Sequence, residues 1–182
     1  MAGGRGTRLD ADREKPLVRV GDAPMVDRVR AALAAADVDA VHAVCSPHAP
    51  DTRAHLAAAD VDVVDAPGEG YVADLSAALE TVGRPALTVA ADLPLLDGAA
   101  VDRVLEAAGG DTLTVVVPSS LKRSLGASVD GSGRRVPAGV NVVGEGADRT
   151  WTVTDPRFAV NVNRPADVAV AESLLSRADS SE

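Results

Sequence analysis

Residues 71–94 read YVADLSAALETVGRPALTVAADLP, and this stretch contains both kinds of element from which the chain is built. Apolar side chains recur at helical spacing in its first half, which predicts a helix over 71–82. The apolar run over 86–91 then predicts a buried strand that ends at Asp92. A helix followed closely by a buried strand is typical of an α/β fold.

The same alternation extends in both directions along the 182 residues. We therefore predict one α/β domain over 1–182, with a Rossmann-like, mostly parallel sheet flanked by helices. The last third is richer in short strand patterns, which predicts antiparallel strands late in the chain. Further helices are predicted over 25–36, 50–59, 97–108 and 166–175, and further strands over 39–45, 61–65, 112–117, 136–144, 150–155 and 158–163.

The composition excludes several classes of function. A formal net charge of −9, dispersed over single acidic residues, disfavours nucleic acid as a partner. The single cysteine, Cys45, excludes an intramolecular disulfide and a zinc site made of cysteines. No signal peptide and no apolar run long enough to span a bilayer is visible, so we expect a cytoplasmic protein without a membrane span.

The segment GGRGTRL, residues 3–9, is a candidate phosphate-binding loop. Glycines let backbone N–H groups approach oxyanions closely, and arginines add charge-assisted donors. The segment is neither a Walker A loop nor a dinucleotide fingerprint, because the GK[ST] ending is missing and Leu9 replaces the third glycine. A flexible glycine-rich terminus is the plainer interpretation. Lys15, one of two lysines in the chain, follows soon after and could reach the same phosphates.

The start of the sequence departs from the usual order of elements. Only Met1 and Ala2 precede the glycine-rich segment, although such a loop in an open α/β sheet normally follows the first strand. The usual first strand is therefore missing from this sequence. Loss of a central parallel strand would expose its neighbours, so we expect the true translation start to lie upstream of Met1.

Asp92 is the candidate metal ligand. It follows the buried strand over 86–91 and should face the crevice in which open α/β sheets bind ligands. A carboxylate at this place can hold Mg²⁺ against phosphate oxygens. The alternative is a cap of the following helix, but Asp97 is better placed for that role.

The segments MAGGRGTRL, EKPL and APMVDRV together resemble the N-terminal signature of the MobA-like nucleotidyltransferase family. The resemblance implies a nucleotide-diphospho-sugar transferase-like fold, a loop that wraps the triphosphate of the nucleotide, and a magnesium ion. It also implies that Arg8, Lys15 and Asp92 are catalytic and that Asp92 binds the metal. The implied phosphate contacts are Gly3, Gly4, Gly6, Thr7, Arg8 and Lys15.

Three later segments look like the archaeal GTP:adenosylcobinamide-phosphate guanylyltransferases of this family: GEGYVADL (68–75), VPAGVNVV (136–143) and FAVNVN (158–163). The resemblance then covers nearly the whole chain and implies GTP and a phosphorylated corrinoid acceptor as substrates. Each segment by itself has a plainer interpretation, as a turn, a β-bulge or a half-exposed strand. The further nucleotide contacts that the resemblance implies are Gly68, Gly70, Gly139, Asn161 and Asn163.

Two rival functions stay open. Guanylyl transfer to molybdopterin or to 2-phospholactate keeps the chemistry and changes the acceptor, although by resemblance those relatives lack the GEGY and PAGVNVV segments. The rival of another class is a regulatory module that binds a nucleotide without catalysis, but a pure binder would not need both Lys15 and Asp92. The order of substrate binding, the choice of base and the formation of a homodimer are left open by the sequence.

Overall fold

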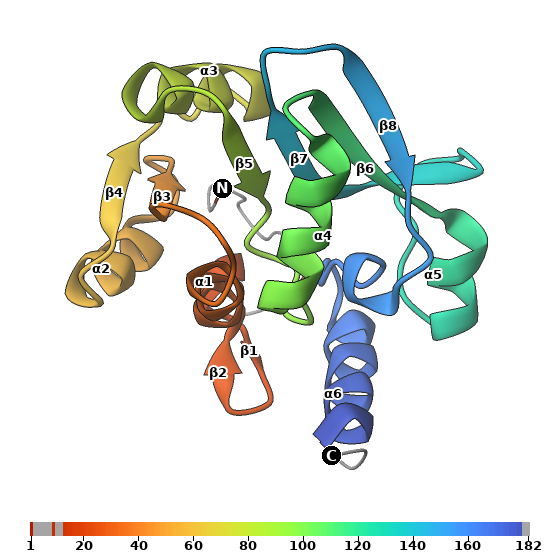
Figure 1. The fold of residues 1–182 in the computed structure, drawn as a ribbon. Coiled ribbons are helices and arrows are strands. Elements are labelled where there is room, and N and C mark those ends of the chain that lie inside the picture. Colours follow the sequence, from red (N-terminus) through yellow and green to blue (C-terminus); the bar gives the residue numbers. More distant parts are fainter. Residues whose placement is uncertain (2–8, 10–12, 180–182) are drawn as a thin grey trace.

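The computed structural model describes residues 1, 9 and 13–179. Helices and strands alternate along most of this chain (Figure 1). The helices are α1 (Met25–Ala34), α2 (Pro50–Ala58), α3 (Tyr71–Val82), α4 (Gly98–Ala108), α5 (Ser119–Leu125) and α6 (Pro165–Asp179), with 3-10 turns η1 (Lys15–Leu17) and η2 (Pro156–Phe158). The strands are β1 (Arg19–Val20), β2 (Ala23–Pro24), β3 (His42–Cys45), β4 (Asp62–Asp65), β5 (Ala86–Val89), β6 (Thr112–Pro118), β7 (Arg135–Val143) and β8 (Asp148–Thr152).

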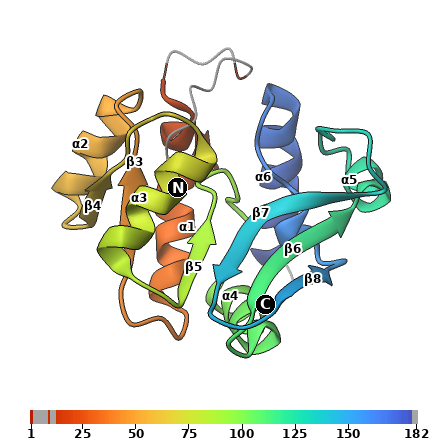
Figure 2. The same cartoon turned by 90° about the horizontal axis from the view of Figure 1, so that it is seen from above.

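The strands form two main groups, and the N-terminus lies between them (Figures 1 and 2). β3 and β4 pair in parallel. The larger group has the order β5-β7-β6-β8, in which β7 runs antiparallel to both β5 and β6, whereas β6 and β8 are parallel. The strands β5, β6 and β8 therefore share one direction, and β7 is the late antiparallel strand that the sequence predicts.

The main core is built from small aliphatic side chains. Helix α4 packs against β6 and β7 and buries Val101, Val104 and Ala108 on one stripe. Asp97 caps this helix, because its carboxylate accepts a hydrogen bond from Ala100 N at 2.8 Å. Phe158 is the largest fully buried side chain of this core. The predicted cap at Asp97 is thus confirmed.

Most predicted elements are present, with ends shifted by a few residues, but the strand predicted over 158–163 is wrong. Phe158 ends η2, and residues 159–163 pair with no strand. Phe158, Val160 and Val162 are fully buried, and this alternation is what resembles a strand. The backbone of this segment forms a hydrogen bond to the loop after β5 instead, since Val162 N donates to Asp92 O at 2.9 Å. Helix α5 and the β1–β2 hairpin were not predicted.

An ion-pair cluster at η2 makes stability depend on pH. Burial raises the pKa of Asp155, but hydrogen bonds from Arg157 and Arg103 outweigh it and hold this pKa at about 2. A carboxyl with a lowered pKa stabilises the fold above its unfolded pKa of about 4, and this contribution is lost as the pH falls through 2. We expect Asp155→Asn to lower the free energy of unfolding at pH 7 by about 1–2 kcal/mol and by less near pH 2.5. Urea unfolding at both pH values, beside exposed Asp148→Asn, checks this; an equal loss at both would contradict it.

Candidate active site

A cavity of about 320 Å³ opens where β3, β4 and β5 end. Ser46 and His48 follow β3, Gly68 and Gly70 follow β4, and Asp92 follows β5, and all five residues line it. The carboxyl ends of strands form the crevice in which open α/β sheets bind ligands. The position predicted for Asp92 is therefore the position that the fold provides.

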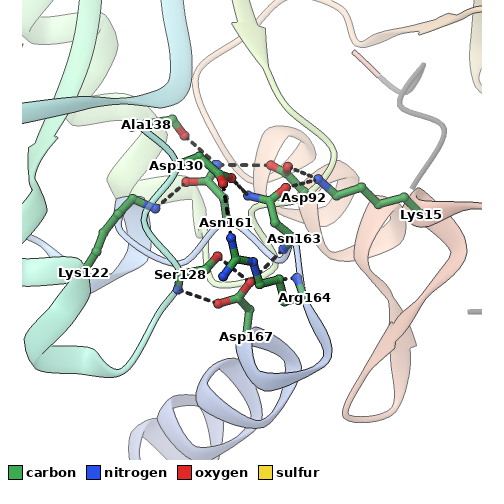
Figure 3. A network of polar contacts seen from close by, with 10 residues as sticks. All are labelled: Lys15, Asp92, Lys122, Ser128, Asp130, Ala138, Asn161, Asn163, Arg164 and Asp167. Atoms are coloured by element: carbon green, nitrogen blue, oxygen red, sulfur yellow. Dashed lines mark hydrogen bonds and ion pairs between the residues drawn. The ribbon is translucent and has the colours of Figure 1, made fainter. Parts of the chain in front are cut away.

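Lys15 and Asp92 meet at this cavity, although 77 residues separate them (Figure 3). The ammonium Nζ of Lys15 donates to Asp92 Oδ2 at 2.5 Å and to Asn163 Oδ1 at 2.6 Å. The Lys15 and Asp92 side chains are only 16% and 17% exposed, so solvent screens this pair less than it would a surface pair. The structure thus brings three of the predicted site residues into direct contact.

Asn161 holds the other oxygen of the Asp92 carboxylate. Its amide Nδ2 donates to Asp92 Oδ1 at 3.1 Å and to Ala138 O at 3.0 Å. Its Oδ1 accepts a hydrogen bond from Lys122 Nζ at 2.9 Å. These partners fix the orientation of the amide, because a carboxylate needs a donor and an ammonium needs an acceptor. Asn161 therefore orients Asp92 (Figure 3).

Lys122 is a site residue that the sequence prediction missed. It lies on α5, is only 4% exposed, and donates to Ala159 O at 2.8 Å as well as to Asn161. Burial lowers the pKa of this ammonium, and the nearby carboxylates of Asp167, Asp92 and Asp130 oppose that effect. The available signal was the scarcity of lysine, which singled out Lys15 and applied equally to Lys122.

Removal of the Lys122 ammonium should loosen the Asp92 carboxylate through Asn161. We expect Lys122→Met to lower kcat about tenfold and the free energy of unfolding by about 1–3 kcal/mol, because the buried carbonyl of Ala159 and the part-buried amide oxygen of Asn161 both lose their donor. The matched control is Arg123→Met on the exposed side of the same helix. Turnover assays and urea unfolding of both variants check this prediction, and a Lys122→Met protein that matches the control in both would contradict it.

Asp167 fixes the loop that carries Asn163. Its fully buried carboxylate accepts hydrogen bonds from Ser128 N and Oγ at 2.7 Å, from Asn163 N at 2.9 Å and from Arg164 N at 2.8 Å. Burial raises the pKa of Asp167, but these hydrogen bonds outweigh it and lower the pKa. Asn163 also donates from Nδ2 to Asp130 Oδ2 at 3.2 Å. The Asn163 amide is thereby held in place to accept from Lys15 (Figure 3).

Glu14 anchors the chain just before Lys15. Its carboxylate accepts hydrogen bonds from Asp51 N at 2.9 Å and Thr52 N at 2.7 Å. Both N–H groups belong to the first turn of α2, where a negative charge is favoured by the helix dipole. The segment that carries Lys15 is therefore tied to a rigid helix.

Of the predicted glycines, Gly68 and Gly70 line the cavity, whereas Gly139 lies behind the residues that line it. Gly68 has φ +76° and donates from its N–H to Asp74 Oδ1 at 2.7 Å, and a Cβ there would lie 2.9 Å from Pro47 Cδ. Gly139 does not line the cavity; with φ +83°, a Cβ would lie 3.0 Å from Ala90 Cβ and 3.3 Å from Asn161 Nδ2. Gly139 thus allows β7 to approach the residues that hold Asp92. The remaining predicted contacts, Gly3, Gly4, Gly6, Thr7 and Arg8, lie outside the described residues.

The donor set suits a hard cation that phosphates help to bind. Within residues 1, 9 and 13–179, no three His, Cys, Asp or Glu side chains are grouped to hold a metal by themselves. Mg²⁺ usually needs only one or two carboxylates when phosphate oxygens and water supply the rest. Asp92 offers a carboxylate that lines the cavity, so the residues present fit a magnesium ion shared with a nucleotide.

Two solved structures have the same fold. A hypothetical transferase from Thermus thermophilus has a TM-score of 0.65 and 18% identity, over 92% of this chain and 96% of that one. A CMP:2-keto-3-deoxy-manno-octonic acid synthetase in complex with CTP has a TM-score of 0.66 and 14% identity, over 97% of each chain. The predicted α/β nucleotidyltransferase-like fold is thus confirmed. In the part of the chain that the structure describes, no helix is long and apolar enough to cross a membrane.

The sequence comparisons agree with the fold. The adenosylcobinamide-phosphate guanylyltransferase of Methanocaldococcus jannaschii is 29% identical over 192 residues, which cover 97% of this chain and 96% of that protein. The model of the MobA-like NTP transferase domain matches residues 1–176. The chain therefore belongs to the MobA-like NTP transferase domain family and is a nucleotidyltransferase.

Proposed function

We propose that the protein transfers GMP from GTP to adenosylcobinamide phosphate, giving adenosylcobinamide-GDP and pyrophosphate. The supporting observation is the alignment with the archaeal guanylyltransferase over nearly the full length of both chains. The Lys15–Asp92–Asn163 cluster also supports the proposal, because it supplies a cation and a carboxylate at a cavity where strands end. A regulatory module that only binds a nucleotide would not require a lysine and a carboxylate held together in this way.

The nucleotide occupies the cavity of about 320 Å³ in this proposal. Gly68 and Gly70 lie at one side of it and leave room for the guanosine, because neither carries a side chain. Tyr71 lines the same side, and its hydroxyl accepts a hydrogen bond from Asn141 Nδ2 at 3.1 Å. Tyr71 is 51% exposed, and its ring offers a flat face against which the base can pack. The triphosphate then points to Lys15 and the glycine-rich segment over 3–9.

The chemical step is an in-line displacement at the α-phosphorus of GTP. An oxygen of the acceptor phosphate forms the new P–O bond, and the bond to the bridging oxygen of pyrophosphate breaks. The acceptor phosphate is already ionised near neutral pH, so no strong general base is required. Mg²⁺ held by Asp92 and the nucleotide would neutralise charge on the phosphates.

Lys15 changes partners when the nucleotide binds in this proposal. Before the nucleotide binds, its ammonium is paired with Asp92 and Asn163. We infer that it turns to the phosphates of GTP, where it stabilises the charge that develops as pyrophosphate leaves. Asn161 and Lys122 keep the Asp92 carboxylate oriented while Lys15 moves. Catalysis then comes from position and charge, with Arg8 as a second cation.

The test is pyrophosphate release from GTP and Mg²⁺ with one acceptor at a time. Adenosylcobinamide phosphate is expected to support release, whereas molybdopterin and 2-phospholactate are expected to give only the background without acceptor. Replacement of GTP by ATP or CTP measures the choice of base. Release with either alternative acceptor alone would move the function to that acceptor, and nucleotide binding without release from any acceptor would favour the regulatory module.

A further inference from the structure

A second carboxylate lines the cavity of about 320 Å³, and the transfer step does not use it. Asp92 is paired with Lys15, whereas this second residue, Asp74, lies in the first turn of α3. Asp74 is only 8% exposed. A buried carboxylate needs hydrogen-bond donors, so the donors that Asp74 can accept from decide its role.

One oxygen of Asp74 holds the neighbouring turn. Its Oδ1 accepts a hydrogen bond from Gly68 N at 2.7 Å, and within residues 1, 9 and 13–179 this is the one hydrogen bond to its side chain. An ionised carboxylate can accept about four hydrogen bonds, so most of this capacity is left for a molecule in the cavity. The N-terminus of α3 also favours a negative charge at this position.

The residues around Asp74 leave room for a flat ring. Tyr71 lies three positions earlier, on the same side of α3, and also lines the cavity. Gly68 and Gly70 carry no side chain, and a Cβ at Gly68 would lie 3.4 Å from His48 Nε2. A ring that packs on Tyr71 can therefore place its edge against the Asp74 carboxylate.

Guanine is the base whose edge matches a carboxylate. Its N1–H and N2–H groups are adjacent donors, and the two carboxylate oxygens are adjacent acceptors. Adenine and cytosine each present a ring nitrogen that accepts beside an amino group that donates, so one carboxylate oxygen would face a lone pair. Uracil presents one N–H between two carbonyls. A carboxylate therefore selects guanine by repelling the other bases as well as by attraction.

We propose that Asp74 is the residue that selects the base of the nucleotide. Its carboxylate accepts hydrogen bonds from N1–H and N2–H of guanine, while Gly68 N keeps its bond to Oδ1. This inference rests on the proposed binding of GTP in the cavity and adds the residue that recognises the base. Asp74 and Asp92 then act on different parts of the nucleotide, one on the base and the other on the phosphates.

The test measures nucleotide binding by calorimetry, with Mg²⁺ and without an acceptor, so it does not depend on transfer. GTP is compared with ITP, which lacks the N2 amino group, with XTP, which has a carbonyl in its place, and with 2′-deoxy-GTP. The proteins are the unchanged chain, Asp74→Asn, Asp74→Ser and the control Glu80→Gln. Glu80 is exposed on the same helix and does not line the cavity. Affinities are compared as ratios between nucleotides, which partial unfolding of a sample does not change.

The unchanged chain should bind GTP at least about tenfold more tightly than ITP and about 100-fold more tightly than XTP, because hydrogen bonds to a charged group are lost. In Asp74→Asn, Oδ1 can stay on Gly68 N while the amide Nδ2 donates to the xanthine carbonyl. XTP should then bind at least as tightly as GTP. Asp74→Ser should reduce the difference between GTP and ITP to about twofold without favouring XTP. Glu80→Gln should keep the ratios of the unchanged chain.

Three outcomes would overturn the proposal. The first is the same GTP:ITP and GTP:XTP ratios in Asp74→Asn as in the control, which would leave the proposed transfer from GTP untouched. The second is weaker binding of 2′-deoxy-GTP than of GTP in the unchanged chain that disappears in Asp74→Asn, because the carboxylate would then bind the ribose. The third is an unchanged chain that does not bind GTP, which would overturn the proposed transfer as well.

Discussion

Asp92→Asn should lower kcat for pyrophosphate release by about 10²–10³-fold, because a neutral amide cannot hold Mg²⁺ as a carboxylate does. The substitution keeps the size of the side chain, so the fold and the cavity should be retained. The hydrogen bond from Asn161 and the pair with Lys15 both depend on the carboxylate, and both weaken. Initial rates over a range of Mg²⁺ concentrations check the effect, and the concentration for half-maximal rate should rise.

The matched control for Asp92 is Asp97→Asn. Asp97 lies five residues further along the same loop and caps α4 without lining the cavity. Its replacement should leave kcat unchanged and alter only stability, since asparagine is also a good N-cap. If Asp92→Asn retained full turnover and the same Mg²⁺ dependence as the control, its role as metal ligand would be wrong.

Lys15→Ala should lower kcat about 10²-fold and weaken GTP binding much less. Lys15 is assigned to the charge that develops as pyrophosphate leaves, and an interaction that strengthens in the transition state acts on kcat more than on binding. In the protein without nucleotide, the substitution removes the ammonium that pairs with Asp92 Oδ2 and leaves the hydrogen bond from Asn161 to Asp92 Oδ1 in place. Steady-state kinetics and calorimetric titration with GTP separate the two effects.

Arg19→Ala is the control for Lys15. It removes a positive charge four residues away, at an exposed position that does not line the cavity. The control should keep kcat and GTP affinity near those of the unchanged protein. A Lys15→Ala protein with unchanged kcat would refute the assigned role, and a loss confined to GTP affinity would make Lys15 a binding residue only.

The local pattern of the sequence predicted the fold and singled out Lys15 and Asp92, which meet at the cavity. Helical spacing and apolar runs depend on neighbours close in the chain, which is why 71–82 and 86–91 were recognised with small errors at their ends. Asp92 could be predicted because the end of a parallel strand is also the place where such sheets bind ligands. Lys15 stood out because lysine is rare in this chain and because it follows closely after the glycine-rich segment.

The segment 158–163 shows where local pattern fails. Its buried and polar residues alternate as in a strand, yet its backbone meets the loop at Asp92. Periodicity reports which side chains are buried but not which backbone groups they lie beside. The two asparagines of this segment were singled out as candidate site residues, but their hydrogen-bond partners, Asp92 and Lys15, could not be assigned before the chain was folded.

The sequence by itself determined the α/β class, the strand that ends at Asp92 and the choice of Lys15. Only the tertiary structure decided which polar groups are satisfied together. Lys122, Asp167 and Glu14 became site residues through contacts with residues 37 to 39 positions away. Hydrogen bonds and desolvation act over a few ångströms in space, whatever the separation along the chain, so the packing of the elements had to be known first.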